Sequence, residues 1–145
     1  AYVDIWHCDA KGIYSDEPTY NPGGGTGSVN TSGQKFLRGY QITDSNGKVA
    51  FTTTYPGWYS GRTIHIHFRA RTYSGTTVVG NFVSQIFFDD AVNDTVMAQP
   101  AYSRTSSREL GIRTTWSTKP PTKSVCWHRF PGMLQMATHR RSLRA

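Results

Sequence analysis

The clearest pattern in the sequence is a strict alternation of apolar and polar side chains over residues 64–71. Successive side chains of a strand point to opposite faces of its sheet. This stretch therefore predicts a strand with one apolar face and one face of histidines and arginines. The apolar members are Ile64, Ile66, Phe68 and Ala70, and the polar members are His65, His67, Arg69 and Arg71.

Four further stretches are predicted to be strands, because each is rich in β-branched or aromatic residues and is bounded by turn signals. They cover residues 3–7, 36–43, 48–54 and 78–88. An Asn-Gly pair between the second and third stretches is a strong hairpin signal. No helical period longer than a turn or two is present. The pattern predicts an all-β fold, a sandwich or barrel of antiparallel strands.

Length and composition fit one domain of ordinary size. The chain has 145 residues, of which 37% are hydrophobic and 13% aromatic. These values exclude a coiled coil and most disordered chains. No run of about 18 apolar residues is present, which argues against a membrane span. Cys8 and Cys126 are too few cysteines for a disulfide scaffold.

The net charge of +7 is confined to one end of the chain. Residues 1–110 contain nine basic and nine acidic side chains, whereas residues 111–145 contain seven basic side chains and no acidic one. A nucleic-acid surface would spread basic residues through the folded elements. We therefore expect no nucleic-acid or membrane partner. We also expect a core over 1–110 and an atypical tail over 111–145. A tail that binds anionic polymers or membranes is the rival hypothesis.

His65 and His67 are candidate metal ligands, because two imidazoles at i and i+2 share one face of a strand. Two hydrogen-bonded surface histidines are the alternative interpretation. A zinc site would usually add a third His, a Cys or a carboxylate nearby, and none follows His67 closely. A tyrosine lies close instead, at Tyr59. Phenolate is a hard anion that suits ferric iron, a Lewis acid able to deprotonate it.

Several motifs, read in order, resemble those of the intradiol ring-cleavage dioxygenases, non-haem Fe(III) enzymes that open catechols. Residues 55–67 read Tyr-Pro-Gly-Trp-Tyr-Ser-Gly-Arg-Thr-Ile-His-Ile-His and resemble the family signature. Residues 6–15 resemble its upstream motif, and Leu37-Arg38-Gly39, Asp44-x-x-Gly47 and Gln85-Ile86-Phe87-Phe88 also match. The resemblance covers residues 3–93. It implies an antiparallel β-sandwich, here expected to be incomplete at the N-terminus and in the C-terminal strand.

The resemblance also implies a ferric site and the roles of its residues. The Fe(III) ligands it implies are Tyr14, Tyr59, His65 and His67. Tyr59 is in addition the ligand that catechol displaces and that takes a substrate proton. Arg62 is implied to stabilise negative charge on the substrate, and Gln85 to lie beside the pocket. The implied reaction is intradiol cleavage of small catechol-type aromatics by O2, which gives cis,cis-muconate-type products.

The short spacer of the Gly-Trp-Tyr-x-Gly-Arg variant resembles the extracellular members, so we expect a secreted protein. Asn30-Thr-Ser and Asn93-Asp-Thr match glycosylation sequons. The alternative function is a non-catalytic β-sandwich module that binds aromatic or carbohydrate polymers. Its stacking residues would be Trp6, Tyr55, Trp58 and Tyr73.

The ends of the chain suggest a fragment. Ala1 opens directly on a strand pattern, with no start Met. Residues 111–145 show neither the family's continuation nor a sustained period. We interpret them as an out-of-frame reading, because some codon choices for 111–118 read two nucleotides later give Asn-Lys-Asn-Asp-Met-Val-Tyr. The core would then lack its closing strand and expose a sheet edge.

Overall fold

The structure is a computed structural model that describes residues 1–22 and 28–103. The predictions for the tail, its reading frame and the core boundary at residue 110 lie outside the described residues. The elements, in order, are β1 (Tyr2–Trp6), β2 (Arg38–Ile42), β3 (His65–Ser74), β4 (Thr77–Phe87), α1 (Asp90–Met97) and a short 3₁₀ turn, η1 (Pro100–Tyr102). Within these ranges no helix is long and apolar enough to cross a membrane.

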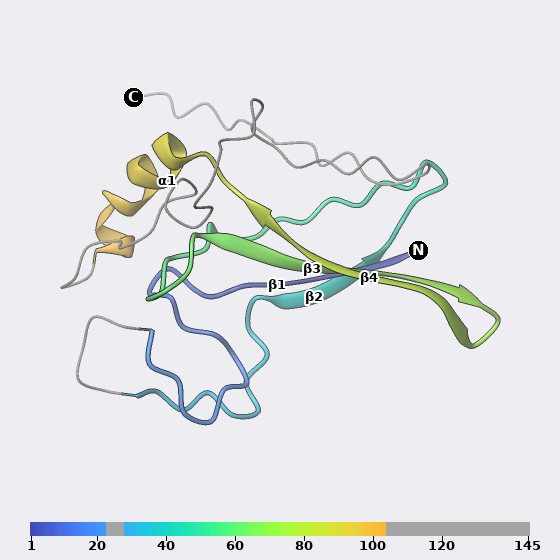
Figure 1. The fold of residues 1–145 in the computed structure, drawn as a ribbon, viewed down its shortest axis with the longest axis horizontal. Helices are drawn as coiled ribbons and strands as arrows, with labels where there is room; N and C mark the ends of the chain where they lie inside the picture. Colours follow the sequence, from blue (N-terminus) through green and yellow to red (C-terminus); the bar gives the residue numbers. More distant parts are fainter. Residues whose placement is uncertain (23–27, 104–145) are drawn as a thin grey trace.

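The four strands form one antiparallel sheet in the order β2-β1-β3-β4 (Figure 1). Among the described residues, strand is much more frequent than helix, which confirms the all-β class. The register pairs Val3 with Ala70, and Trp6 with His67. Directly opposed residues share a face, so the sheet has the apolar face and the histidine face that the alternation predicts.

The apolar face and the loops behind it form the core. Val3, Ile5 and Ala70 are buried on this face, and Ile64 and Trp58 are buried just before β3. Burial of a large apolar side chain contributes about 1.5–3 kcal/mol. The apolar side of the sheet therefore fixes β3, and β3 in turn presents its histidines on the other side.

The predicted return strand over residues 48–54 is wrong. These residues form an extended segment that does not join the sheet (Figure 1). The Asp44 turn does form, since Asp44 N donates to Lys48 O at 2.9 Å. Beyond it, the side chain of Gln41 bonds both backbone groups of Ala50: its Nε2 donates to the carbonyl at 2.6 Å and its Oε1 accepts from the amide at 3.4 Å. A side chain thus replaces the backbone ladder.

The two-turn helix α1 was not identified in the sequence. Asp89 caps it, because its carboxylate accepts a hydrogen bond from Ala91 N at 2.9 Å. The helix is attached to the body through Asn93, which is fully buried. Its Oδ1 accepts from the hydroxyl of Tyr55 at 2.7 Å, and its Nδ2 donates to Phe88 O at 3.2 Å.

His7 is a buried histidine that joins the end of β1 to the extended segment. Its Nδ1 donates to Cys8 O at 2.8 Å, and its Nε2 accepts from the hydroxyl of Thr53 at 2.8 Å. Burial is the main cause that lowers the pKa of His7. The folded protein therefore keeps this imidazole neutral at a pH where the unfolded chain protonates it.

We expect the metal-free protein to lose stability as the pH falls below about 6.5, the pKa of an exposed histidine. The unfolded state then binds more protons than the folded state. Replacing His7 by Gln should reduce this pH dependence. Denaturant unfolding of both proteins at pH 7.5 and pH 5.5 measures the effect. Equal losses of unfolding free energy in the two proteins would contradict the assignment to His7.

Candidate metal centre

Four side chains from three separate segments meet around the Nε2 atom of His65. The Nε2 of His67 lies 3.0 Å from it, the hydroxyl of Tyr59 3.2 Å and the hydroxyl of Tyr14 3.4 Å. One nitrogen lone pair accepts one strong hydrogen bond. The four atoms, two nitrogens and two oxygens, therefore cannot all be paired by hydrogen bonds to one another. Their arrangement is better suited to surround a shared cation.

The backbone fixes the orientation of His65. This residue is the first of β3 and is only 1% exposed. Its Nδ1 donates to the carbonyl of Thr63 at 2.6 Å. The proton is thus held on Nδ1, and the lone pair of Nε2 faces the other three groups, as a ligating histidine requires. Nothing in the sequence pattern identified Thr63 as this partner.

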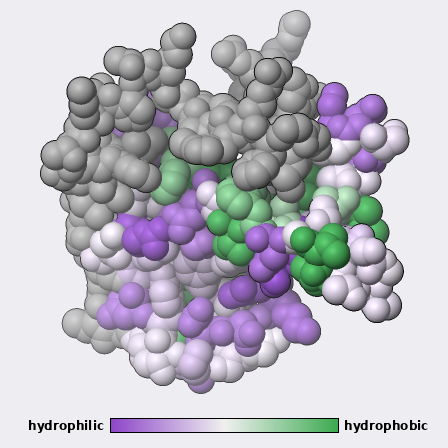
Figure 2. All heavy atoms as spheres, turned by 45° about the vertical axis from the view of Figure 1, so that its right-hand side comes forward, coloured by the Kyte–Doolittle hydropathy of each residue, from purple (hydrophilic) through white to green (hydrophobic). Residues whose placement is uncertain are grey.

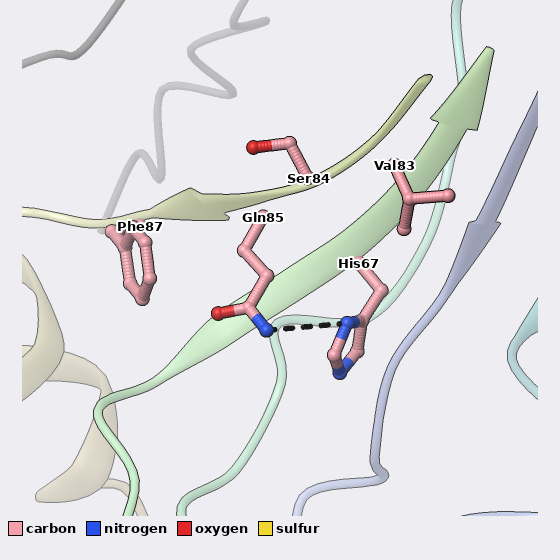
Figure 3. A pocket seen from close by; sticks show the side chains of 5 residues that line it. All are labelled: His67, Val83, Ser84, Gln85 and Phe87. Atoms are coloured by element: carbon pink, nitrogen blue, oxygen red, sulfur yellow. Dashed lines mark hydrogen bonds between the residues drawn. The ribbon is translucent and has the colours of Figure 1, made fainter. Parts of the chain in front are cut away.

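His67 is held on one face of its ring and at one edge. Trp6, its cross-strand neighbour, stacks on it with ring centroids 4.9 Å apart and an interplanar angle of 1°. At the ring edge, Gln85 Nε2 donates to His67 Nδ1 at 3.4 Å (Figure 3). Arg62 donates to Gln85 Oε1 at 2.7 Å and so sets which end of the amide faces the histidine. Arg62 and Gln85 thus lie beside the ligand candidates.

The two tyrosines come from different loops but pack against each other. The rings of Tyr14 and Tyr59 have centroids 5.6 Å apart at 79°. Tyr20 packs edge-on against both, at 5.8 and 6.1 Å. The hydroxyl of Thr31 donates to the carbonyl of Tyr14 at 2.7 Å, and Arg38 donates to the neighbouring Ser15 carbonyl at 2.8 Å. These bonds fasten the Tyr14 loop beside the sheet.

Burial shapes the ionisation of all four groups. It raises the pKa of Tyr14 and of Tyr59. It also lowers the pKa of His65, and together with the neighbouring His65 and Arg62 charges it lowers that of His67 to about 4. At neutral pH both imidazoles are uncharged. His65 offers its Nε2 lone pair, whereas the bond from Gln85 to His67 Nδ1 places the proton of neutral His67 on Nε2, where a bound metal would displace it. The phenols keep their protons until a strong Lewis acid displaces them.

This donor set fits ferric iron. Within residues 1–22 and 28–103, no group of three His, Cys, Asp or Glu side chains is placed to hold a metal ion. A cation at this cluster must therefore take phenol oxygens besides its two imidazoles. Tyrosine is an established ligand of protein-bound iron, and two phenolates would offset much of the charge of a trivalent ion.

An open cavity of about 290 Å³ lies next to the cluster. Figure 3 shows its lining side chains, which are His67, Val83, Ser84, Gln85 and Phe87. Its size is near the lower end of small-molecule sites, about 300 Å³. Val83 and Phe87 give the lining apolar surface, and the Gln85 amide is the polar group beside the candidate ligand His67.

The four aromatic residues of the alternative binding module do not form one surface. Trp58 is only 3% exposed, Tyr55 donates its hydroxyl to Asn93 and Trp6 stacks on His67. Tyr73 is exposed near the β3–β4 turn. Figure 2 shows patches of hydrophobic surface among hydrophilic side chains. The exposed apolar side chains of β4 are Val78, Val79, Phe82 and Val83, of which three are aliphatic and offer no stacking platform.

Two solved structures with a similar fold are dioxygenases, and one of them is named as a member of the family that the motifs resemble. An intradiol ring-cleavage dioxygenase from Tetranychus urticae matches with a TM-score of 0.57 and 34% identity, over 75% of this chain and 52% of that one. A second solved structure, of a dioxygenase, matches with a TM-score of 0.56 and 32% identity over the same shares. No family model matches the sequence. The comparison with curated proteins also gives no match.

These similarities confirm the resemblance that the motifs indicated. The chain is a relative of the intradiol ring-cleavage dioxygenases. It spans about half the length of the solved structures that it matches.

Proposed function

We propose that this chain carries the ferric site of an intradiol dioxygenase and cleaves catechol-type aromatics with O2. Cleavage would fall between the two hydroxyl-bearing carbons and give a cis,cis-muconate-type product. The observation that carries the proposal is the approach of three donor atoms to within 3.4 Å of His65 Nε2. The relationship to solved dioxygenases supports it.

Tyr14, Tyr59, His65 and His67 would hold Fe(III). When bound, the ion supplies Lewis acidity that draws electron density from a chelated catechol ring and makes the ring reactive toward O2. The imidazoles would contribute uncharged nitrogen donors at neutral pH, since burial lowers both pKa values. The phenols contribute oxygen donors that become anionic in its presence.

Tyr59 is suited to accept a proton from the substrate. It is less enclosed than Tyr14, which is 7% exposed, and it lies in the same short turn as Arg62, with which it forms an isolated β-bridge. The Arg62 charge partly opposes the rise in the pKa of Tyr59 that burial causes. A phenolate released at this position would take up a catechol proton at its hydroxyl oxygen.

Arg62 and Gln85 would orient the substrate and stabilise its charge. The guanidinium of Arg62 bonds the Gln85 amide at 2.7 Å, and Gln85 lines the cavity beside His67. A cation held in place beside the site would stabilise negative charge that develops on the ring oxygens or on reduced oxygen. Both side chains are thus positioned before a substrate enters.

Oxygen consumption tests the proposed reaction. Iron-loaded protein should consume O2 with catechol or a substituted catechol, and the product should show the ultraviolet absorption of a muconate. Resorcinol, whose hydroxyls are not adjacent, is the matched substrate control and should give no uptake. Iron-loaded protein that shows no uptake with any member of a catechol panel would contradict the proposal.

We further propose that the protein is secreted and that only the exposed one of its two sequons is glycosylated. Asn30 is exposed in a loop, and its Oδ1 accepts from Ser32 N at 2.9 Å. Asn93 has no exposed surface and bonds Tyr55 and Phe88. We expect secreted protein to carry glycan at Asn30 and none at Asn93. Mass spectrometry before and after glycosidase treatment checks this, and an Asn93 glycan on folded protein would contradict it.

A further inference from the structure

The two tyrosine-bearing loops touch backbone to backbone at one point, between the Asp9 turn and Gly57. The amide of Gly57 donates to Asp9 O at 2.9 Å, and the thiol of Cys8 donates to Gly57 O at 3.4 Å. The Asp9 turn leads directly into Tyr14, and Gly57 is two residues before Tyr59. This contact is therefore a short connection between the two phenols that does not pass through the histidine strand.

The absence of a side chain at residue 57 makes this contact possible. A Cβ atom added to Gly57 would lie 2.5 Å from Ala10 O and 2.7 Å from Asp9 O. Both neighbours are backbone atoms, which cannot rotate away as a flexible side chain does. Gly57 is also buried, so a substituted loop can accommodate the new atom only by moving away from the Asp9 turn.

Asp9 gives the turn a fixed shape. Its Oδ1 accepts from the amides of Lys11 and Ile13 at 2.8 and 2.9 Å. Its own amide donates to Ile13 O at 2.8 Å, and its carbonyl also accepts from Gly12 N at 3.1 Å. The turn is thus a rigid surface on which the Gly57 loop is seated. A shift at this surface is transmitted to Tyr14 on one side and to Tyr59 on the other.

We propose that Gly57, seated on the Asp9 turn, is a positioning residue that sets the separation of the Tyr14 and Tyr59 oxygens. The inference rests on the proposed function, because the two oxygens are taken as ligands of one ion. Functional groups of a metal site must be held within about 0.5 Å of their productive geometry. A displacement of the size that a Cβ at residue 57 demands exceeds this tolerance.

Ferric titration followed by visible absorption tests the proposal on the whole chain. Gly57→Ala should bind Fe(III) at least about tenfold more weakly than wild type, the loss typical when support of a metal ligand is removed. Its phenolate-to-iron absorption band should shift or weaken. Gly39→Ala is the matched control, because a Cβ there meets nothing within 4 Å, and it should bind within about twofold of wild type.

Two further comparisons separate positioning from simple destabilisation. Val3→Ala removes buried side-chain atoms from the opposite face of the sheet, so it should lower the melting temperature and leave the band unchanged. Asp9→Ala should shift the band as Gly57→Ala does. Asp9→Asn should restore it, because its amide oxygen still accepts from Lys11 and Ile13. This pair keeps the proposal testable if Gly57→Ala fails to fold.

Wild-type affinity and an unmoved band in Gly57→Ala, or an unmoved band in Asp9→Ala, would overturn the positioning role. Wild-type protein that binds no ferric iron would overturn the proposed function instead. In that case crystal structures of the metal-free wild type and Gly57→Ala decide the positioning role. An unchanged separation of the two phenol oxygens would overturn it, and a wider separation would support it.

Discussion

Replacing His65 by Ala is expected to abolish ferric-iron binding and, with it, catechol cleavage. The Nε2 of this residue is the atom on which the other three donors converge. The residue is buried and its ring is oriented by Thr63 O. Without its central nitrogen the site keeps only His67 and the two phenols, and no group of three His, Cys, Asp or Glu side chains among the described residues could hold the ion instead. Iron content after equilibrium dialysis and oxygen uptake measure the loss.

His7→Gln is the matched control for that experiment. His7 is buried like His65, but it bonds Cys8 O and Thr53 and belongs to none of the contacts of the cluster. We expect this variant to bind iron in wild-type amount. Iron binding and turnover retained by His65→Ala, at a level comparable with His7→Gln, would rule out the assigned ligand set.

Replacing Tyr59 by Phe should lower turnover by at least about 100-fold, the contribution typical of a positioned proton acceptor, while part of the iron binding remains. The ring is kept, so its packing on Tyr14 and Tyr20 is maintained. Only the oxygen that faces His65 is lost. The visible band should move, because one of two phenolate donors is gone. Stopped-flow absorption and steady-state oxygen uptake measure the two effects.

Tyr20→Phe separates the role of Tyr59 from that of ring packing. Tyr20 contacts both candidate ligands through its ring but is not one of the proposed ligands. This variant should keep the absorption band and most of the turnover. A Tyr59→Phe protein with the same spectrum and rate as Tyr20→Phe would show that Tyr59 is neither a ligand nor a proton acceptor.

The local pattern of apolar and polar residues predicted the four strands of the sheet. It failed for residues 48–54, where a side chain takes the place of backbone pairing. The alternation over residues 64–71 places the two histidines on one face, as the register of β3 shows. Residues 48–54 have strand composition, yet Gln41 bonds the backbone of Ala50 and no ladder forms. Helix α1 is too short for a convincing period. Its one usable signal was Asp89, a helix-capping residue before Ala91.

The candidate site could be predicted only in part, because its members are distant in sequence. His65 and His67 follow from strand geometry alone. Tyr14 lies 51 residues before His65, and only the order of family motifs pointed to it. The stacking of Trp6 on His67 depends on the register between β1 and β3. The close approach at Gly57 depends on how two loops pack against each other. Neither the register between two strands nor the packing of two loops can be predicted from a local sequence pattern.

The most direct test of the central claim is the visible absorption of the wild-type protein during titration with ferric iron. Four ligands that include Tyr14 and Tyr59 predict a red to burgundy colour from phenolate-to-iron charge transfer, which saturates at one iron per chain and changes when catechol is added. A folded protein that stays colourless through the titration, or whose colour does not saturate, would contradict the account.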